Sequence, residues 1–500
     1  MWPKIKNLFL QNRDTRQTVA KNTFWLSVSN FGGRFLRAIL IIYAARVLGA
    51  GGWGVFSYAV SLVAFITSFT DIGINAILIR EAVKAGDDSE RRKVISTSFI
   101  TKLAGLLLGV IAIIFITPHI TNVKEVSGIL SIVVFILIFD TFRDFGFYVI
   151  RSLEKMEWEA ALFLFTNAAI VLLGIGFLTL SPTVKSLAYS YAIGDALGMV
   201  ATLVFLGKRL SGILSNFSKS HLKTILLSAW PLAITSFLGV LMINADILVI
   251  GWLKSAEDIG LYSAAQRIVQ ITYLLPSIIN VSVLPTFARL ARKNNEKMRR
   301  VMESIVSLVF AIGIPISVGG FILGKSIILF FFGQEYVPGA PSFQILILTI
   351  LADFPATILA GFLFSYDRQR TLIINGAVAG TMNILLDFLL IPRFGITGSA
   401  IATLLAQFIS MRYLWWVAKR TNHFQILSHL KRVFIAAAAM AFVAFGLDLL
   451  SLNIIATIIL SGSVYIGTLF LLKEPLIKEM KLILHPASAE PAAQVEPSSI

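Results

Sequence analysis

Apolar segments of about 20 residues alternate with short polar segments from residue 23 to residue 472. A helix of about 20 residues crosses a hydrocarbon core of about 30 Å, since each residue adds about 1.5 Å. The pattern therefore predicts an all-α integral membrane protein with about fourteen transmembrane helices. The expected spans are 23–45, 53–79, 94–117, 126–150, 158–180, 186–207, 224–251, 259–288, 301–324, 342–365, 371–391, 397–418, 433–450 and 454–472.

The composition agrees with this pattern and narrows the class of protein. Hydrophobic residues make up 57% of the chain and charged residues 14%, with a mean hydropathy of +0.82. These values exclude an ordinary soluble protein. The N-terminal stretch is basic and has no apolar run that ends in a small-residue cleavage site, so no cleavable signal peptide is expected. The absence of cysteine excludes disulfides and thiol chemistry.

The basic residues predict the orientation of the helices. If the N-terminus is cytoplasmic, 31 of the 43 Lys and Arg residues fall on the cytoplasmic side, 6 in outer loops and 6 within spans. This alternation follows the positive-inside rule, so we expect a multi-pass protein of the inner (cytoplasmic) membrane with both termini in the cytoplasm. The net charge of +16 is scattered over many loops, so no nucleic-acid partner is expected.

Two stretches of the chain match each other at a shift of 206 residues, which equals six spans. Both place a polar turn between two apolar segments. An even number of spans puts the two halves on the same side of the membrane, which predicts parallel repeats: two six-helix lobes around a central cavity, followed by two extra C-terminal helices. The matching pairs are Phe31 and Phe237, Gly33 and Gly239, Ile41 and Ile247, Gly54 and Gly260, Ser57 and Ser263, Ala59 and Ala265, and Val63 and Val269.

The spans and linkers predict six regions along the chain. The tail is rich in Pro, Ala, Ser and Glu, a composition typical of disordered segments. The regions are a cytoplasmic N-terminal segment 1–22, a first lobe 23–207, a cytoplasmic linker 208–223, a second lobe 224–420, a helix pair 433–472 and a cytoplasmic tail 473–500.

The first span has a cationic face. Asn30, Arg34 and Arg37 share one side of the helix, and Arg34 lies about 15 Å along it, close to the membrane midplane. A charge in hydrocarbon costs roughly 2.5 to 3.5 kcal/mol, so a functional role is the first hypothesis. The planar guanidinium binds phosphate oxygens bidentately. The alternative is a buried ion pair with Asp71 or with an acid on another helix.

Other spans also contain polar side chains. Gln266 and Gln270 share a face of the eighth span, with Arg267 beside it, and this group suits either a cavity wall or a buried structural contact. Lys102 and Arg412 are expected to reach the cytoplasmic surface by extending their long side chains.

Five further charged residues are candidates for ion coupling, substrate binding or structural ion pairs. On the fourth span, Arg143 lies beside Asp140 and Asp144, and it either lines the cavity or pairs with these two carboxylates. Asp246 has two possible roles. It carries a proton or a sodium ion, or it is an acid next to Asn244 that forms hydrogen bonds between helices. Asp387 and Asn383 lie on one polar face of the eleventh span.

Several short motifs in a fixed order give a family resemblance. Over residues 20 to about 420 the chain resembles the polysaccharide-transporter branch of the multidrug/oligosaccharidyl-lipid/polysaccharide exporter superfamily. One departure is Ala50, where many relatives have proline, and it affects only a turn. The motifs are Arg46–Gly49, Gly54–Ser57, Asp71–Gly73, Arg80–Glu81, Pro231–Leu232, Asp246, Gly260–Ser263, Pro276, Leu284–Pro285, Phe332–Tyr336, Asn383–Ile384, Ile391–Ile396 and Gly398–Thr403.

The resemblance implies a flippase that moves a polyprenyl-pyrophosphate-linked oligosaccharide from the cytoplasmic to the outer leaflet. Its expected partners are this substrate, membrane lipids and, as a further candidate, other polysaccharide assembly proteins. A drug exporter of the same superfamily is the nearer alternative, although such proteins usually have twelve spans. A membrane glycosyltransferase or polymerase would need a sizeable catalytic loop, whereas the predicted outer loops have about five to ten residues.

Features of enzymes and of metal or cofactor sites are nearly absent from the sequence. The five histidines are scattered without the spacing of a metal site. No phosphate-cradling glycine loop with a following Lys-Ser/Thr is present, so no ATP site is expected in this chain. We therefore expect neither an enzyme nor a bound cofactor, and transport would use the membrane potential or an ion gradient.

Overall fold

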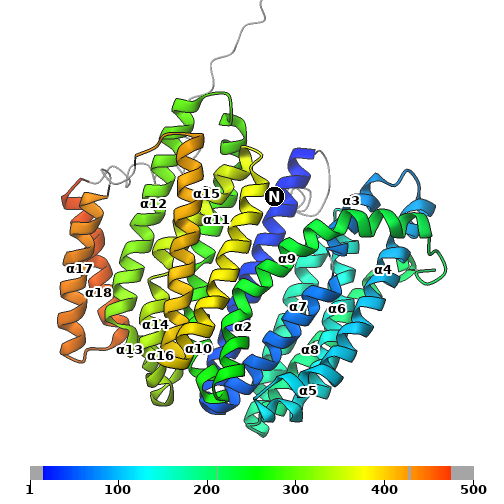
Figure 1. Cartoon of the computed structure of the whole chain (residues 1–500), viewed down its shortest axis with the longest axis horizontal. Helices are drawn as coiled ribbons and strands as arrows, with labels where there is room; N and C mark the ends of the chain where they lie inside the picture. Colours follow the sequence, from blue (N-terminus) through cyan, green and yellow to red (C-terminus); the bar gives the residue numbers. More distant parts are fainter. Residues whose placement is uncertain (1–14, 72, 211, 426–429, 474–500) are drawn as a thin grey trace, which may run out of the picture. The chain divides into compact units, whose positions relative to one another are not determined.

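The computed structural model describes residues 15–71, 73–210, 212–425 and 430–473, and within these ranges it contains no β-strand (Figure 1). The predicted all-α membrane class is confirmed. Most of the predicted N-terminal segment and nearly all of the predicted tail lie outside the described residues.

The helices follow one another with short connections. A π-helix over Ala112–Ile116 and 3-10 helices over Lys124–Ile129, Gly207–Leu210 and Gln334–Gly339 lie between them. The α-helices are α2 (Thr15–Asp71), α3 (Ile74–Lys84), α4 (Asp88–Ile111), α5 (Thr117–Ile120), α6 (Leu130–Ser152), α7 (Met156–Leu180), α8 (Val184–Leu206), α9 (Lys219–Leu253), α10 (Ala256–Thr272), α11 (Leu274–Leu290), α12 (Asn295–Ile322), α13 (Gly324–Phe332), α14 (Ala340–Ile347), α15 (Ile350–Ser365), α16 (Gln369–Thr421), α17 (Lys431–Leu449) and α18 (Ile454–Leu471).

Among the described residues, eleven helices are long and apolar enough to cross a membrane, or twelve if the bent pair Gln334–Ile347 and Ile350–Ser365 is one span. Two of these helices, α2 and α16, are unusually long, with 57 and 53 residues. Each breaks at a glycine with positive φ, Gly49 at 68° and Gly395 at 61°. Both breaks coincide with predicted loops, so each of these helices contains two of the predicted spans. The total of fourteen stays a prediction.

The second predicted span, 53–79, is wrong at its C-terminal end. The α2 helix ends at Asp71, and α3 begins at Ile74 after Gly73, whose φ is 69°. Side chains other than glycine rarely adopt this conformation. A Cβ on Gly73 would also lie 2.7 Å from the carbonyl oxygen of Ala229, so the chain turns here against α9.

The described chain forms two compact units. The first contains the described residues up to Arg267 together with Phe331–Ser342 and Gly376–Ala406, and the second contains Ile268–Phe330, Phe343–Asn375 and the described residues from Gln407 onward. The boundaries fall within α10, α13, α14 and α16, so these units do not coincide with the predicted lobes 23–207 and 224–420. Those lobes stay predictions.

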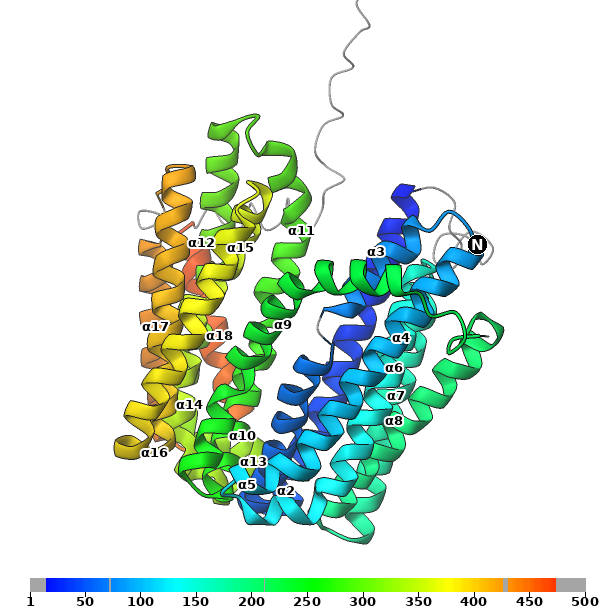
Figure 2. The same ribbon diagram turned by 45° about the vertical axis from the view of Figure 1, so that its right-hand side comes forward.

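Small residues allow close helix packing in the first unit, where α2 contacts α7, and α8 contacts both α6 and α7. A Cβ on Gly33 would lie 2.3 Å from the Phe163 ring, and one on Gly198 would lie 2.1 Å from the Thr166 hydroxyl. Figure 2 shows the bend in α9, whose first part contacts α3.

In the second unit, α12 packs against α15 and α17, and α17 packs against α18 (Figure 1). The hairpin of α17 and α18 matches the two extra C-terminal spans to within two residues at each end. Two hydrogen bonds attach it to the unit: the Tyr465 hydroxyl donates to the Ala311 carbonyl at 2.6 Å, and Ser326 Oγ donates to an Asp448 carboxylate oxygen at 2.7 Å.

Candidate functional site

The cationic face of α2 is only partly exposed. The Asn30 side chain donates to the Leu26 carbonyl at 2.7 Å within its own helix. Arg34 is exposed, whereas Arg37 is half-buried and donates from Nε to Asn167 Oδ1 on α7 at 3.1 Å. Among the described residues Asp71 pairs with Lys102 instead of Arg34 or Arg37. Asp195 of α8 interacts electrostatically with Arg37, so the alternative of an acid on another helix stays a prediction.

Arg37 and Arg267 come together around one tyrosine. The Arg37 guanidinium lies over the Tyr191 ring, 5.1 Å from its centroid. Arg267, on the part of α10 within the first unit, interacts electrostatically with both Tyr191 and Arg37. Two neighbouring half-buried cations repel each other, so a bound anion would lower the free energy of this arrangement. Residues 230 positions apart thus form one cationic pair.

Gln266 and Gln270, which were predicted to share a face beside Arg267, do not join the pair of Arg37 and Arg267. Gln266 Nε2 lies 3.3 Å from the Ile243 carbonyl and 3.5 Å from Asp246 Oδ2, so its side chain belongs with an acidic cluster. Gln270 lies in the second unit, and its role as a ligand stays a prediction.

Arg143 is neutralised on two sides. This buried side chain forms ion pairs with Asp140 of α6 and Asp195 of α8. The expected second partner, Asp144, interacts electrostatically with Arg143 but forms its ion pair with Lys102. Asp195 was missed, although an acid inside a predicted span is a signal that the sequence contains. The two pairs favour the structural alternative for Arg143, which holds α6 against α8.

Lys102 does not extend to the surface, contrary to the prediction. It is 3% exposed, and its Nζ lies 3.2 Å from Asp71 and 3.6 Å from Asp144. Asn75 completes the group: its Oδ1 accepts from Lys102 at 2.9 Å, and its amide donates to Asp144 at 3.0 Å. Two acids compensate the buried ammonium inside the bundle, so Asp71 and Asp144 form structural ion pairs.

Asp246 and Asp387 form the centre of an acidic cluster. They are 1% and 0% exposed, and neither is in an ion pair among the described residues. Asp246 accepts from the Tyr262 hydroxyl at 2.5 Å and from the Thr403 hydroxyl at 2.9 Å. Asp387 accepts from Ser399 at 2.8 Å.

The cluster has unsatisfied acceptors. One oxygen of each carboxyl group, Asp246 Oδ1 and Asp387 Oδ2, has no hydrogen-bond donor among the described residues. Buried carboxylates without compensation are costly, and a proton or a small cation would satisfy both oxygens. The predicted neighbour Asn244 is not a partner, since its amide donates to the Val240 carbonyl. The sequence did not predict the hydroxyl groups that donate to these two carboxylates, because serine, threonine and tyrosine are common in helices and carry no signal by themselves.

Repeat-related glycines bring α2 and α10 into contact. A Cβ on Gly54 would lie 1.7 Å from the Ala256 carbonyl oxygen, and one on Gly260 would lie 1.9 Å from the Ala50 carbonyl oxygen. Gly54 and Gly260 are 206 positions apart, as are Ala50 and Ala256. The contact is therefore reciprocal, which indicates a local two-fold axis between the two segments.

A serine pair continues this contact by one turn. Ser263 Oγ donates to Ser57 Oγ at 3.2 Å, and both side chains are buried. These residues are also 206 positions apart, so equivalent positions of the two copies meet each other. The contacts support the internal repeat found in the sequence. They lie beside the two polar turns that the charge pattern places on the outer side.

The break in α2 is held by the segment Phe331–Tyr336. A Glu335 carboxylate oxygen accepts from the backbone N–H of Ala50 at 2.6 Å, directly after Gly49. The Tyr336 hydroxyl donates to the Ala45 carbonyl at 2.8 Å. The Glu335 carboxylate thus accepts a hydrogen bond at the start of the part of α2 that follows the break, where the first N–H groups of a helix have no partner within the helix. This motif, noted only for its resemblance, has a structural role.

The first unit thus combines a half-buried cationic pair, a buried acidic cluster and a reciprocal glycine contact inside apolar helices. This combination defines an all-helical, multi-pass membrane transporter. The chain belongs to the polysaccharide biosynthesis protein family, whose model matches residues 19–291. A second model, MatE, matches residues 231–389.

Two curated relatives and one solved structure are similar over most of the chain. The probable flippase AglR of Haloferax volcanii is 26% identical over 434 residues, which cover 83% of this chain and 87% of the relative. The putative O-antigen transporter of Shigella flexneri is 24% identical over 435 residues, covering 81% and 98%. The lipid II flippase MurJ, in an inward closed conformation, has a TM-score of 0.75 at 17% identity, covering 90% and 99%. This structural likeness shows a shared fold.

Proposed function

We propose that this protein is a flippase that moves a polyprenyl-pyrophosphate-linked oligosaccharide from the cytoplasmic to the outer leaflet. The family and the two relatives described as a flippase and an O-antigen transporter support this function. The protein acts in the cytoplasmic membrane with both termini in the cytoplasm, and it moves its substrate without catalysis. Other polysaccharide assembly proteins are candidate partners.

The main structural support is the cationic pair of Arg37 and Arg267. A pyrophosphate cannot enter hydrocarbon unaided, because its charge would lose hydration without compensation. Two guanidinium groups supply that compensation and can each bind phosphate oxygens through two N–H groups. Exposed Arg34 and Asn30, on the same face of α2, extend this surface. Arg143 holds the surrounding helices in place through its two ion pairs.

The reciprocal contact of α2 and α10 suits a gate. In the proposed cycle the head group enters from the cytoplasmic side and binds the cationic pair. The contact at Gly54 and Gly260 then separates, and the head group leaves outward while the polyprenyl tail stays in lipid. Glycines permit this contact to re-form closely, since no side chain intervenes.

The acidic cluster supplies ion coupling. A proton or cation shared by Asp246 and Asp387 would neutralise them in one state and leave in another. Movement of one charge across 100 mV is worth about 2.3 kcal/mol. The cluster joins α9, α10 and α16, so its occupancy would change how these helices pack.

Replacing Asp387 with asparagine is expected to lower the flipping rate at least about tenfold, since losing one charge-assisted contact costs about 1.5 kcal/mol or more. The remaining rate should no longer depend on an imposed sodium or proton gradient. Flipping in vesicles with each gradient applied separately measures both effects. Asp88→Asn is the control, because Asp88 is exposed and pairs with Arg91. Retention of the gradient response by Asp387→Asn would disprove the coupling role.

The proposed function itself is tested by depletion of the protein. Lipid-linked oligosaccharide should then accumulate on the cytoplasmic face, and its head group should be inaccessible to reagents added outside. The alternative is the ion-coupled exporter of drugs, for which the MatE match is the relevant observation. If no lipid-linked oligosaccharide accumulates and the cells lose drug efflux instead, the exporter assignment replaces the flippase.

A further inference from the structure

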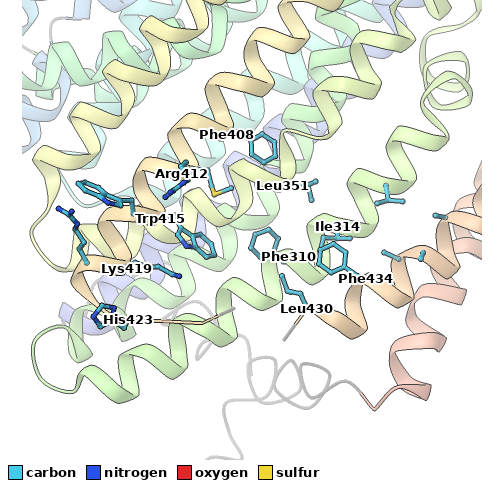
Figure 3. A pocket seen from close by; sticks show the side chains of 17 residues that line it. Phe310, Ile314, Leu351, Phe408, Arg412, Trp415, Lys419, His423, Leu430 and Phe434 are labelled. Carbon is cyan, nitrogen blue, oxygen red and sulfur yellow. The ribbon is translucent and has the colours of Figure 1, made fainter. Parts of the chain in front are cut away.

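A large apolar groove lies in the second unit between α12, α15, α16 and α17 (Figure 3). Its volume is about 980 Å³. Phe310 and Ile314 of α12, Phe408 of α16 and Phe434 of α17 are among the residues that line it. Phe408 and Phe434 are themselves exposed, so the groove presents aromatic surface that the unit does not cover.

Cationic side chains gather at one end of this groove. Arg412 and Lys419 are seven positions apart and share one face of α16, and His423 follows just after the helix ends at Thr421. Figure 3 shows Lys419 and His423 at the end opposite Ile314 and Phe434. The Arg420 guanidinium stacks over the Trp416 ring at 3.8 Å, which fixes a further cation at this end.

The charge at this end is unbalanced. None of the described residues that line the groove is an acid. An adjoining pocket of about 470 Å³ shares Lys419 and His423 and adds Arg299 and Glu303, which are 3.9 Å apart. A single carboxylate thus accompanies the cationic cluster, and it faces Arg299.

We propose that this groove binds an anionic phospholipid of the surrounding membrane. Its acyl chains lie along the aromatic and aliphatic wall, and its phosphate is bound by Lys419, Arg420 and His423. Basic pockets between transmembrane helices on the cytoplasmic side are typical sites for such head groups, and the basic-residue pattern places this end of α16 on that side. Trp415 and Trp416 also line the groove near these cations. Indole rings are enriched at the boundary between hydrocarbon and head groups, which agrees with a lipid head group at this end.

An anionic phospholipid is favoured over a carrier lipid by mass action. Membrane phospholipids greatly outnumber the lipid-linked substrate, so a groove open to the bilayer is filled by them even at modest affinity. The bound lipid would contact α12, α17 and the C-terminal part of α16 together. This inference does not depend on the proposed function, because binding is measured directly.

The test is a titration of the purified full-length protein in detergent with phosphatidylglycerol and, separately, with phosphatidylcholine, followed by native mass spectrometry. One phosphatidylglycerol should be retained at concentrations at which phosphatidylcholine is not. The double variant Lys419→Gln with Arg420→Gln should weaken binding about thirtyfold, since each basic side chain near an anionic lipid is worth about 1 kcal/mol. Lys293→Gln with Lys297→Gln is the matched control, because both lysines are exposed and lie outside the groove.

A second variant tests the apolar part of the groove. Ala438 is exposed and lines the wall, so Ala438→Phe fills space without displacing a buried side chain. It should also weaken phosphatidylglycerol binding at least tenfold. Equal loss in the lysine control would overturn the proposal in favour of unspecific attraction. Unchanged binding by Ala438→Phe, together with competition by inorganic phosphate, would reduce the site to an anion site. Displacement by equimolar polyprenyl phosphate would assign it to the carrier lipid.

Discussion

The double variant Arg37→Ala with Arg267→Ala is expected to reduce flipping at least a hundredfold. Each guanidinium contributes charge-assisted hydrogen bonds to a phosphate worth about 1.5 to 3 kcal/mol, and both arginines interact with the buried Tyr191. The rate is measured in vesicles of matched protein content with a lipid-linked oligosaccharide as substrate. Each single variant should lose about tenfold or more.

Controls separate this loss from misfolding. Arg92→Ala removes an exposed arginine of α4 and should flip substrate at the wild-type rate. Arg37→Lys and Arg267→Lys keep the charge but lose the planar fork, so they should recover part of the rate. If the double alanine variant folds, as judged by size-exclusion chromatography, and still flips substrate normally, the head group binds elsewhere.

A disulfide between cysteines at positions 57 and 263 is expected to stop flipping completely and reversibly. The Oγ atoms of Ser57 and Ser263 are 3.2 Å apart, and the chain contains no cysteine of its own. A mild oxidant should therefore link only these two positions, and a reductant should restore the rate. The physical reason is that α2 and α10 must separate at this place for the head group to leave.

Two further variants complete this test. Gly54→Ala puts a methyl group 1.7 Å from the Ala256 carbonyl oxygen, so the contact cannot close and flipping should fall at least tenfold. Gly51→Ala is the matched control, because a Cβ there would have no neighbour within 4 Å. Continued flipping by the fully oxidised double-cysteine protein would rule out the gate.

Some of the candidate site was predictable because the relevant signals are local. Arg37 and Arg267 were found because a cation inside an apolar run is rare and costly. The shift of 206 residues identified Gly54 and Gly260 as equivalent positions, but it did not predict that they pack against each other. The roles of Asp195 and Glu335 were missed, since an acid gains its role from the helix that packs against it.

The sequence by itself determined the class of protein, most of the spans and the repeat, since the lengths of apolar runs and their order are properties of the chain alone. Only the tertiary structure decided which charges are neutralised. Lys102 forms an ion pair with Asp71, which is 31 positions away in the sequence. Asp246 accepts a hydrogen bond from Thr403, which is 157 positions away. Burial makes an uncompensated charge or acceptor costly, and the compensating group comes from whichever helix packs alongside. In the structure Lys102 and Arg143 hold helices together through such pairs, whereas in our proposal Arg37 and Arg267 bind the head group.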